Sequence, residues 1–175
     1  YDAYQTGGVY LNYLLTPATV CLAVPLYKQI HLLRQYGWAI LLSVFTGTVT
    51  SLLGVFLLSV LFHLDHAMYV TLLPKSITTA IGMGMSEELG GIVNITVAVI
   101  VVTGVTGNVI GEWVLKIFHV KDRIAKGLAL GTSAHAIGTS KAMEMGEIEG
   151  AMSSLSIVVA GLLTVIGANI FSIFY

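Results

Sequence analysis

The sequence predicts an all-α, polytopic membrane protein, on three observations: a strongly apolar composition, long uncharged stretches, and an alternation of continuous and broken apolar segments. Hydrophobic residues make up 56% and charged residues 10% of the chain, with a mean hydropathy of +0.89. Ordinary soluble domains have about 45–50% and about 25%, respectively. Residues 36–62 and 150–175 contain no Asp, Glu, Lys, Arg or His. At about 1.5 Å per residue each stretch gives roughly 40 Å of helix, enough to span the roughly 30 Å hydrocarbon core with tilt.

Short charged loops divide the chain into apolar segments of two kinds. The continuous segments occupy 36–62, 92–115 and 150–174. The segments that are broken by Pro, Gly or polar residues occupy 8–27, 67–86 and 124–143. The expected elements are therefore three spanning helices, each preceded by a broken or re-entrant segment.

An internal repeat relates these segments to one another. Pro17 and Pro74 are 57 positions apart, and the same spacing separates Gly47, Gly104 and Gly161 in the continuous segments. We interpret the pattern as three copies of a unit made from one broken segment and one continuous helix. Interrupted helices at corresponding positions point to a transport site, because they expose backbone dipoles near the membrane midplane. The alternative is that Pro and Gly only kink ordinary spanning helices.

The distribution of basic residues predicts a topology. Lys and Arg concentrate in the loops at 28–34 and 116–126, and such loops are expected on the cytoplasmic side of a membrane. Both loops can lie on one side only if segment 67–86 leaves the membrane on the side from which it entered. The sequence therefore predicts that this segment is a re-entrant hairpin.

Two lysines lie next to apolar segments and are candidates for chemistry. An ionisable group inside a membrane costs at least a few kcal/mol, so it indicates a functional site unless it reaches the surface. Lys75, in the tripeptide PKS, is interpreted as functional, with snorkelling as the alternative. Lys141 lies close to Glu144, so a surface position or an ion pair is the expected role.

Hydroxyl side chains surround both lysines, and His135 lies among small residues between two alanines. If 132–141 is helical, Thr132, His135 and Thr139 fall at i, i+3 and i+7 and share one face. Hydroxyl donors, a lysine and helix N-termini together would suit a small carboxylate. A sodium site built from carbonyls at helix C-termini is an alternative, as is interhelical packing through the hydroxyls. His135 could relay protons, donate to a substrate, or make an interhelical hydrogen bond.

Other features predict packing and exclude several classes of function. Glu112 and Lys116 are expected to pair at i, i+4, and the glycine pairs 107/111 and 127/131 are expected to let helices approach closely. A net charge of −1 gives no reason to expect nucleic-acid binding. The chain has one cysteine and no nucleophile elbow, phosphate loop, zinc motif or dinucleotide fingerprint. We therefore predict no enzyme, no metal site and no cofactor.

Three stretches resemble signature sequences of the LrgB/CidB family of bacterial inner-membrane proteins. They are LLTPATVCLAVPLYKQ, LLPKSITTAIGMGMSEELGG and GLALGTSAHAIGTSKAMEMGEIEGAMSSL. The resemblance implies one LrgB-like transmembrane domain over residues 1–175 that lacks the family's preceding membrane segments. Ala80 stands where many relatives have a second proline, which puts the break in this segment in question. By the resemblance, the substrate-binding residues would be Pro74, Lys75, Ser76, Thr78, Thr79, Thr132, His135, Gly138 and Thr139.

The resemblance also implies two functions. Plastid members are similar and exchange glycolate and glycerate, and some bacterial relatives are linked to pyruvate, so a carrier of small (hydroxy)monocarboxylates is expected. Bacterial members are described as holin-like or antiholin-like modulators of murein hydrolase export and autolysis. The expected partners are a small organic anion, the lipid bilayer, an LrgA/CidA-type membrane protein and further copies of the chain. A bacterial inner membrane is expected rather than a plastid inner envelope.

Overall fold

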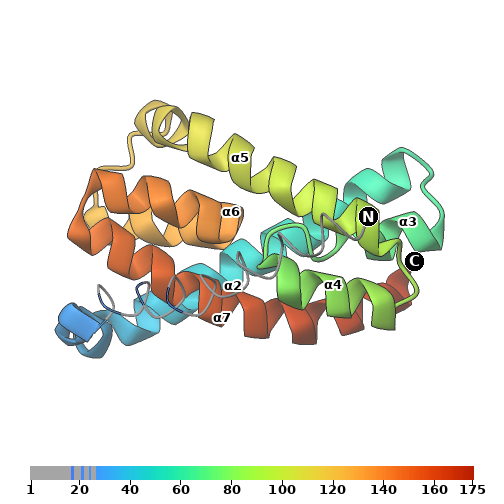
Figure 1. Ribbon diagram of the computed structural model, residues 1–175, viewed down its shortest axis with the longest axis horizontal. Helices are drawn as coiled ribbons and strands as arrows, with labels where there is room; N and C mark the ends of the chain where they lie inside the picture. The colour runs from blue at the N-terminus through green and yellow to red at the C-terminus, as the bar shows by residue number, and fades with distance from the viewer. Residues whose placement is uncertain (1–16, 18–20, 22–23, 25–26) are drawn as a thin grey trace, which may run out of the picture.

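The computed structural model describes residues 17, 21, 24 and 27–175, and their regular elements are all helical (Figure 1). Three helices are long and apolar enough to cross a membrane, over Arg34–Leu61, Val93–Ile117 and Glu147–Phe174. They confirm the predicted fold class and its three continuous segments. The predicted broken segment 8–27 lies outside the continuously described residues. The elements are α2 (Ile30–Leu61), α3 (His66–Leu72), α4 (Thr79–Glu88), α5 (Val93–Ile117), α6 (Arg123–Met145), α7 (Glu147–Phe171) and the 3₁₀ turn η1 (Ser172–Phe174).

The three continuous helices extend along the length of the molecule, with α2 and α7 running in one direction and α5 in the other (Figure 1). Helices α2 and α7 pack closely, because Leu52 of α2 contacts Gly167 of α7. Three apolar clusters form the core of the described residues. The first is built on Leu52, Val55, Tyr69, Val70, Leu73, Ile77, Met85 and Ala168, the second on Ile40, Val44, Leu128, Ala151, Met152, Leu155 and Ala160, and the smallest on Leu115, Leu130 and Ala142.

Helices α3 and α4 form a re-entrant hairpin, which we call the outer hairpin (residues 66–88). Helix α3 begins at the N-cap Asp65, whose carboxylate accepts from the backbone N–H of Met68. It ends before Pro74, which has no N–H to continue the helical ladder, and α4 starts after the intervening turn.

The two ends of the outer hairpin are held together at one end of the molecule. The Thr96 hydroxyl oxygen lies 3.0 Å from the carbonyl oxygen of Thr71 in α3 and 2.7 Å from the hydroxyl oxygen of Ser86 in α4. The Thr71 hydroxyl in turn accepts from the backbone N–H of Ile92, just before α5. The segment therefore leaves where it entered, as predicted, and the break forms although position 80 is Ala.

Helix α6 forms a second re-entrant hairpin, the inner hairpin (residues 123–145), which enters from the opposite end (Figure 1). Its helical geometry is interrupted at Ala134 and His135. Along α5, Gly104 contacts the break, whereas Glu112 forms an ion pair with Lys141 after the return. The predicted broken segment 124–143 thus also returns to its starting side.

Glycines let the inner hairpin pack closely against α5 and α7, as the sequence predicted. A Cβ at Gly107 or Gly111 would meet Ala134 or Leu130 of α6. A Cβ at Gly127 or Gly131 would meet backbone atoms of Glu149 or Ser153 in α7. These close approaches hold α6 between α5 and α7.

Charge divides the molecule into two ends. Seven of the eight Lys and Arg residues lie at the end where α2 and α7 begin, which we call the basic end; they are Lys28, Arg34, Lys116, Lys121, Arg123, Lys126 and Lys141. The opposite, acidic end carries Asp65, Glu87 and Glu88. The two basic loops share one side, as predicted, and the positive-inside rule assigns the basic end to the cytoplasm.

Most of the charged side chains at the basic end form ion pairs. Glu112 pairs with Lys116 at 3.0 Å and with Lys141 at 3.3 Å, which confirms the roles predicted for both lysines. The buried Glu149 carboxylate accepts from Arg123 at 2.9 Å and raises the pKa of that guanidinium. Lys75 is the one basic residue of the chain that does not lie at this end.

Two copies of the predicted repeat are visible in the described residues. Each consists of a re-entrant hairpin followed by a continuous helix, and the two hairpins enter from opposite ends. The repeating glycines mark where a continuous helix meets a hairpin: Gly47 faces Thr132, Gly104 faces His135 and Gly161 faces Ile81. The recurring spacing therefore coincides with the places where a continuous helix and a hairpin come close together.

Candidate functional site

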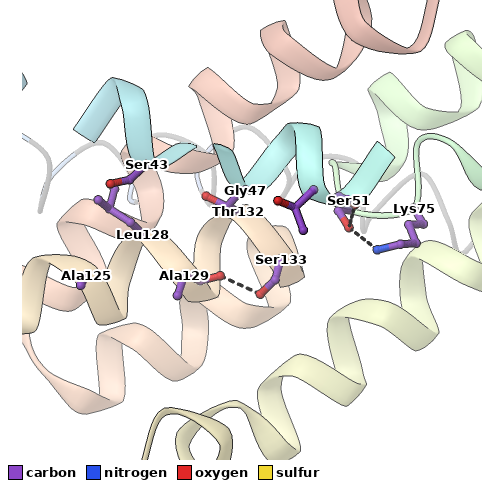
Figure 2. Close-up of a pocket in the computed structure, with 11 residues that line it drawn as sticks. Ser43, Gly47, Ser51, Lys75, Ala125, Leu128, Ala129, Thr132 and Ser133 are labelled. Carbon is purple, nitrogen blue, oxygen red and sulfur yellow. Dashed lines mark hydrogen bonds between the residues drawn. The ribbon is translucent and has the colours of Figure 1, made fainter. Parts of the chain in front are cut away.

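A cavity of about 460 Å³ lies between α2, the tip of the outer hairpin and the first half of α6, and we call it the central cavity (Figure 2). Its lining is mostly hydroxyl groups and small side chains, with a single basic group. The lining residues are Ser43, Gly47, Thr50, Ser51, Lys75, Ser76, Ala125, Leu128, Ala129, Thr132 and Ser133.

The cavity follows two helices from the basic end toward the middle of the molecule. Its α2 lining runs from Ser43 to Ser51 and its α6 lining from Ala125 to Ser133, which is about 12 Å along each helix. In Figure 2, Ala125 lies at one extreme of the cavity and Lys75 at the other. Lys75 thus lies at the end of the cavity that is farther from the basic end, which we call the deep end.

The Lys75 side chain is half-buried and is held by the hydroxyl of Ser76. Its ammonium donates to the Ser76 hydroxyl at 2.8 Å, and the Ser76 and Ser51 oxygens are 3.2 Å apart. Within the described part of the chain, the ion pairs formed by acidic residues involve other basic groups and not Lys75. The central cavity therefore carries a positive charge that can attract an anion.

Other lining hydroxyls are held by their own helices. Ser133 donates to the carbonyl of Ala129 at 2.7 Å, and Thr50 donates to the carbonyl of Thr46 at 2.7 Å. Both oxygens keep lone pairs, and a hydroxyl can rotate to donate to a bound solute instead. The walls of the cavity thus offer adaptable polar contacts.

His135 lies outside the central cavity, at the tip of the inner hairpin. Its backbone has φ 43° and ψ −139°, a conformation that residues with a side chain rarely adopt. The ring nitrogen Nε2 lies 2.9 Å from the backbone carbonyl oxygen of Ile100 in α5, and a Cβ at Gly104 would come within 2.6 Å of the ring. His135 therefore ties the break in α6 to the middle of α5.

The prediction that Thr132, His135 and Thr139 share one helix face is wrong. The break at Ala134 and His135 reverses the chain, so the three side chains face different neighbours. Thr132 lines the central cavity, His135 contacts α5, and Thr139 lies 2.7 Å from the Ser153 hydroxyl of α7. Helical spacing does not predict which side chains share a face here, because the helix is interrupted within residues 132–141.

Comparison with known proteins identifies the family of the chain. Residues 1–174 match the model of the LrgB-like family. The chain belongs to the LrgB-like family. It is 43% identical over 171 residues to the antiholin-like protein LrgB of Bacillus subtilis (strain 168), covering 98% of this chain and 74% of that protein. It is 42% identical to the antiholin-like proteins LrgB of Bacillus cereus (strain B4264) and Bacillus anthracis (strain CDC 684 / NRRL 3495), over 95% of this chain and 72% of each relative.

No solved structure matches this LrgB-family chain. Its bacterial relatives and the three apolar spanning helices among its described residues identify it as a bacterial multi-pass membrane protein. The resemblance noted in the sequence is therefore confirmed at the level of the family.

The residues singled out for substrate binding in this LrgB-family chain are only partly brought together. Lys75, Ser76 and Thr132 line the central cavity. Six others lie outside its lining: Pro74, Thr78, Thr79, His135, Gly138 and Thr139. Pro74 packs against Gly82, Thr78 and Thr79 open α4, and Gly138 contacts Ala134 across the α6 break.

Sequence reasoning missed the contribution of α2. Ser43, Gly47 and Ser51 are spaced by four residues, which places them on one face of a helix. A stripe of small and hydroxyl residues in an otherwise apolar spanning helix could have indicated a polar neighbour. The same residues would also suit simple helix packing, so the stripe alone does not distinguish a cavity from a contact.

The strained backbone at His135 leads to a stability prediction. We expect His135→Gly to be more stable than His135→Ala by roughly 1–2 kcal/mol, because both variants lose the Ile100 contact and only glycine adopts this φ freely. Ordinary helix interiors show the reverse order, with Ala favoured over Gly by about 1 kcal/mol. Unfolding in detergent measures the difference, with Ile110→Gly and Ile110→Ala on the exposed face of α5 as the matched pair. The same order at both positions would contradict a strained break.

Proposed function

We propose that the central cavity binds and passes small organic monoanions, which makes the chain a carrier of (hydroxy)monocarboxylates such as glycolate, glycerate or pyruvate. The observation that carries this proposal is the position of Lys75 at the deep end of a cavity lined with hydroxyl groups. One ammonium balances one carboxylate, and the hydroxyls can satisfy the oxygens that a bound solute would otherwise leave unpaired.

The size and surroundings of the cavity support a small solute. A volume of about 460 Å³ lies within the range of small-molecule sites. Helix α4 begins three residues after Ser76, and no side chain caps its first N–H groups. The positive dipole end of this helix adds favourable potential for an anion near the tip of the outer hairpin.

Two re-entrant hairpins that enter from opposite ends are also consistent with transport. In carriers, interrupted helices meet near the midplane, and irregular backbone at that depth is tolerated where protein or a watery cavity surrounds it. Here the outer hairpin supplies Lys75 and Ser76, and the inner hairpin supplies Thr132. Both tips therefore contribute to one polar site.

A second candidate function is modulation of murein hydrolase export and autolysis, together with an LrgA/CidA-type partner and further copies of the chain. It is favoured by the name of a relative, the antiholin-like protein LrgB of Bacillus subtilis, which is 43% identical over 98% of this chain. The name of these relatives supports this candidate more directly than it supports a carrier. One molecule could serve both functions if lysis control follows from metabolite flux.

A variant that fills the central cavity distinguishes the carrier function from the modulation of autolysis. We expect Gly47→Leu to reduce saturable uptake of radiolabelled glycolate and pyruvate into proteoliposomes by about tenfold or more, because the new side chain projects toward Thr132 in the lining. Gly54→Leu, two turns further along α2, is the control, since a Cβ there meets nothing within 4 Å.

The same variants are then tested for control of autolysis in bacteria that depend on the protein. Loss of uptake with unchanged lysis control would show that the two activities are separate. Equal uptake by the Gly47 and Gly54 variants, with both folded, would contradict a substrate path through the central cavity.

A further inference from the structure

Three side chains from two elements form a continuous polar chain at the deep end of the central cavity. The Lys75 ammonium donates to the Ser76 hydroxyl at 2.8 Å, and the Ser76 oxygen lies 3.2 Å from that of Ser51 (Figure 2). Lys75 and Ser76 belong to the outer hairpin, whereas Ser51 belongs to α2. The connection therefore links the basic group to a helix that packs against both the cavity and α7.

The direction of the hydrogen bonds follows from the donors available. An ammonium has donors and no acceptor, so the Ser76 oxygen must accept from Lys75. Each hydroxyl has one proton, and a neighbouring positive charge favours protons that point away from it. This favours Ser76 as the donor to Ser51, so Ser51 anchors the chain of hydrogen bonds that begins at the ammonium.

The position of Ser51 is fixed by the packing of α2. The next residue, Leu52, is buried in the core cluster and would touch any side chain at Gly167 of α7. The Lys75 side chain, by contrast, is a flexible stem that ends in a point charge. A rigid hydroxyl at Ser51 can therefore hold the ammonium in place through Ser76.

We propose that Ser51 is a positioning residue that acts through Ser76 to fix the Lys75 ammonium in the central cavity. This inference rests on the proposed carrier function for its role in binding, although the positioning itself does not require transport. Ser51 does not belong to the stretches from which the substrate-binding residues were predicted.

The test is a double-mutant cycle between Ser51→Ala and Ser76→Ala in proteoliposomes that contain the full-length protein. We expect Ser76→Ala to raise the KM for glycolate or pyruvate by about tenfold, the value of one hydrogen bond to a charged group, and Ser51→Ala to raise it by no more than that, with a smaller change in the maximal rate. Because Ser51 acts through Ser76, the double variant should be no worse than Ser76→Ala alone. Additive effects would overturn the proposal.

A conservative variant and a control variant distinguish the effect of losing the Ser51 hydroxyl from the effect of a change in packing. Ser51→Thr keeps the hydroxyl and should restore most of the lost affinity. Thr46→Val serves as the control, because Thr46 is exposed on the same helix and donates to the carbonyl of Leu42. If Ser51→Thr behaves like Ser51→Ala, the hydroxyl does not position Lys75 and the proposal falls.

A second readout does not depend on transport. An amine-specific reagent should modify Lys75 several-fold faster in Ser51→Ala than in the wild type, as measured by mass spectrometry of the folded protein, because the ammonium is no longer held. Faster modification without any uptake by the wild-type protein would support the positioning and contradict the carrier. Saturable uptake by the wild type, with unchanged KM and unchanged modification in Ser51→Ala, would overturn the positioning and leave the carrier intact.

Discussion

Replacing Lys75 with alanine is expected to abolish saturable uptake of glycolate and pyruvate, with a fall in initial rate of more than about a hundredfold. Lys75 is the one basic residue in the lining of the central cavity, and an uncompensated charge at membrane depth costs roughly 2.5–3.5 kcal/mol. That cost corresponds to about a hundredfold, since 1.4 kcal/mol is a factor of ten. The measurement is uptake of each radiolabelled anion into proteoliposomes that contain the full-length protein.

Two further variants make this result specific. Lys75→Arg keeps the charge in a larger, planar group and should retain part of the uptake. Lys141→Ala removes a basic residue that is paired with Glu112 and Glu144 at the basic end, so its uptake should match the wild type. Normal uptake by a folded Lys75→Ala protein would show that the substrate-binding site does not depend on Lys75. No uptake by the folded wild type would favour the antiholin-like function and a structural role for both lysines.

Gly131→Leu is expected to prevent correct folding. A Cβ at this position would meet the backbone carbonyl of Ser153 and the hydroxyl of Ser156 in α7, so relief requires the two helices to separate. Extra atoms in a well-packed core cost roughly 1–3 kcal/mol even where side chains can move, and a backbone neighbour leaves less room for adjustment. The yield of monodisperse protein in detergent and its unfolding temperature measure the effect.

Gly54→Leu provides the matched control for this result. Gly54 is also a glycine of a long helix, but a Cβ there meets no atom within 4 Å. We expect this variant to fold and unfold like the wild type. If Gly131→Leu is as stable as Gly54→Leu, the close approach of the inner hairpin to α7 is not required for the fold.

The spanning helices could be predicted from sequence because the cost of burying a charge acts on each segment separately. Residues 36–62 and 150–175 contain no ionisable side chain of the acidic, basic or histidine type, and α2 and α7 cover most of both stretches. The positions of the breaks were also visible, because Pro74 and the polar run around His135 interrupt otherwise apolar sequence. The two basic loops then gave the re-entrant topology of segment 67–86.

The make-up of the cavity was predictable only in part. Lys75 stood out because an ionisable group in an apolar segment is costly wherever the chain places it. Ser43 and Ser51 did not, because a hydroxyl on a spanning helix has the same sequence signature whether it faces lipid, another helix or a cavity. Their contribution depends on which neighbour packs against α2.

The sequence by itself determined that this LrgB-family chain is a helical membrane protein with broken segments, because hydrophobicity, charge and missing backbone donors are properties of single residues and their near neighbours. Only the tertiary structure decided that Ser51, Lys75 and Thr132 line one cavity while His135 and Thr139 do not. The physical reason is the conformation of Ala134 and His135. It reverses the chain within α6 and is held in place by contacts of His135 with Ile100 and Gly104, which are distant in the sequence.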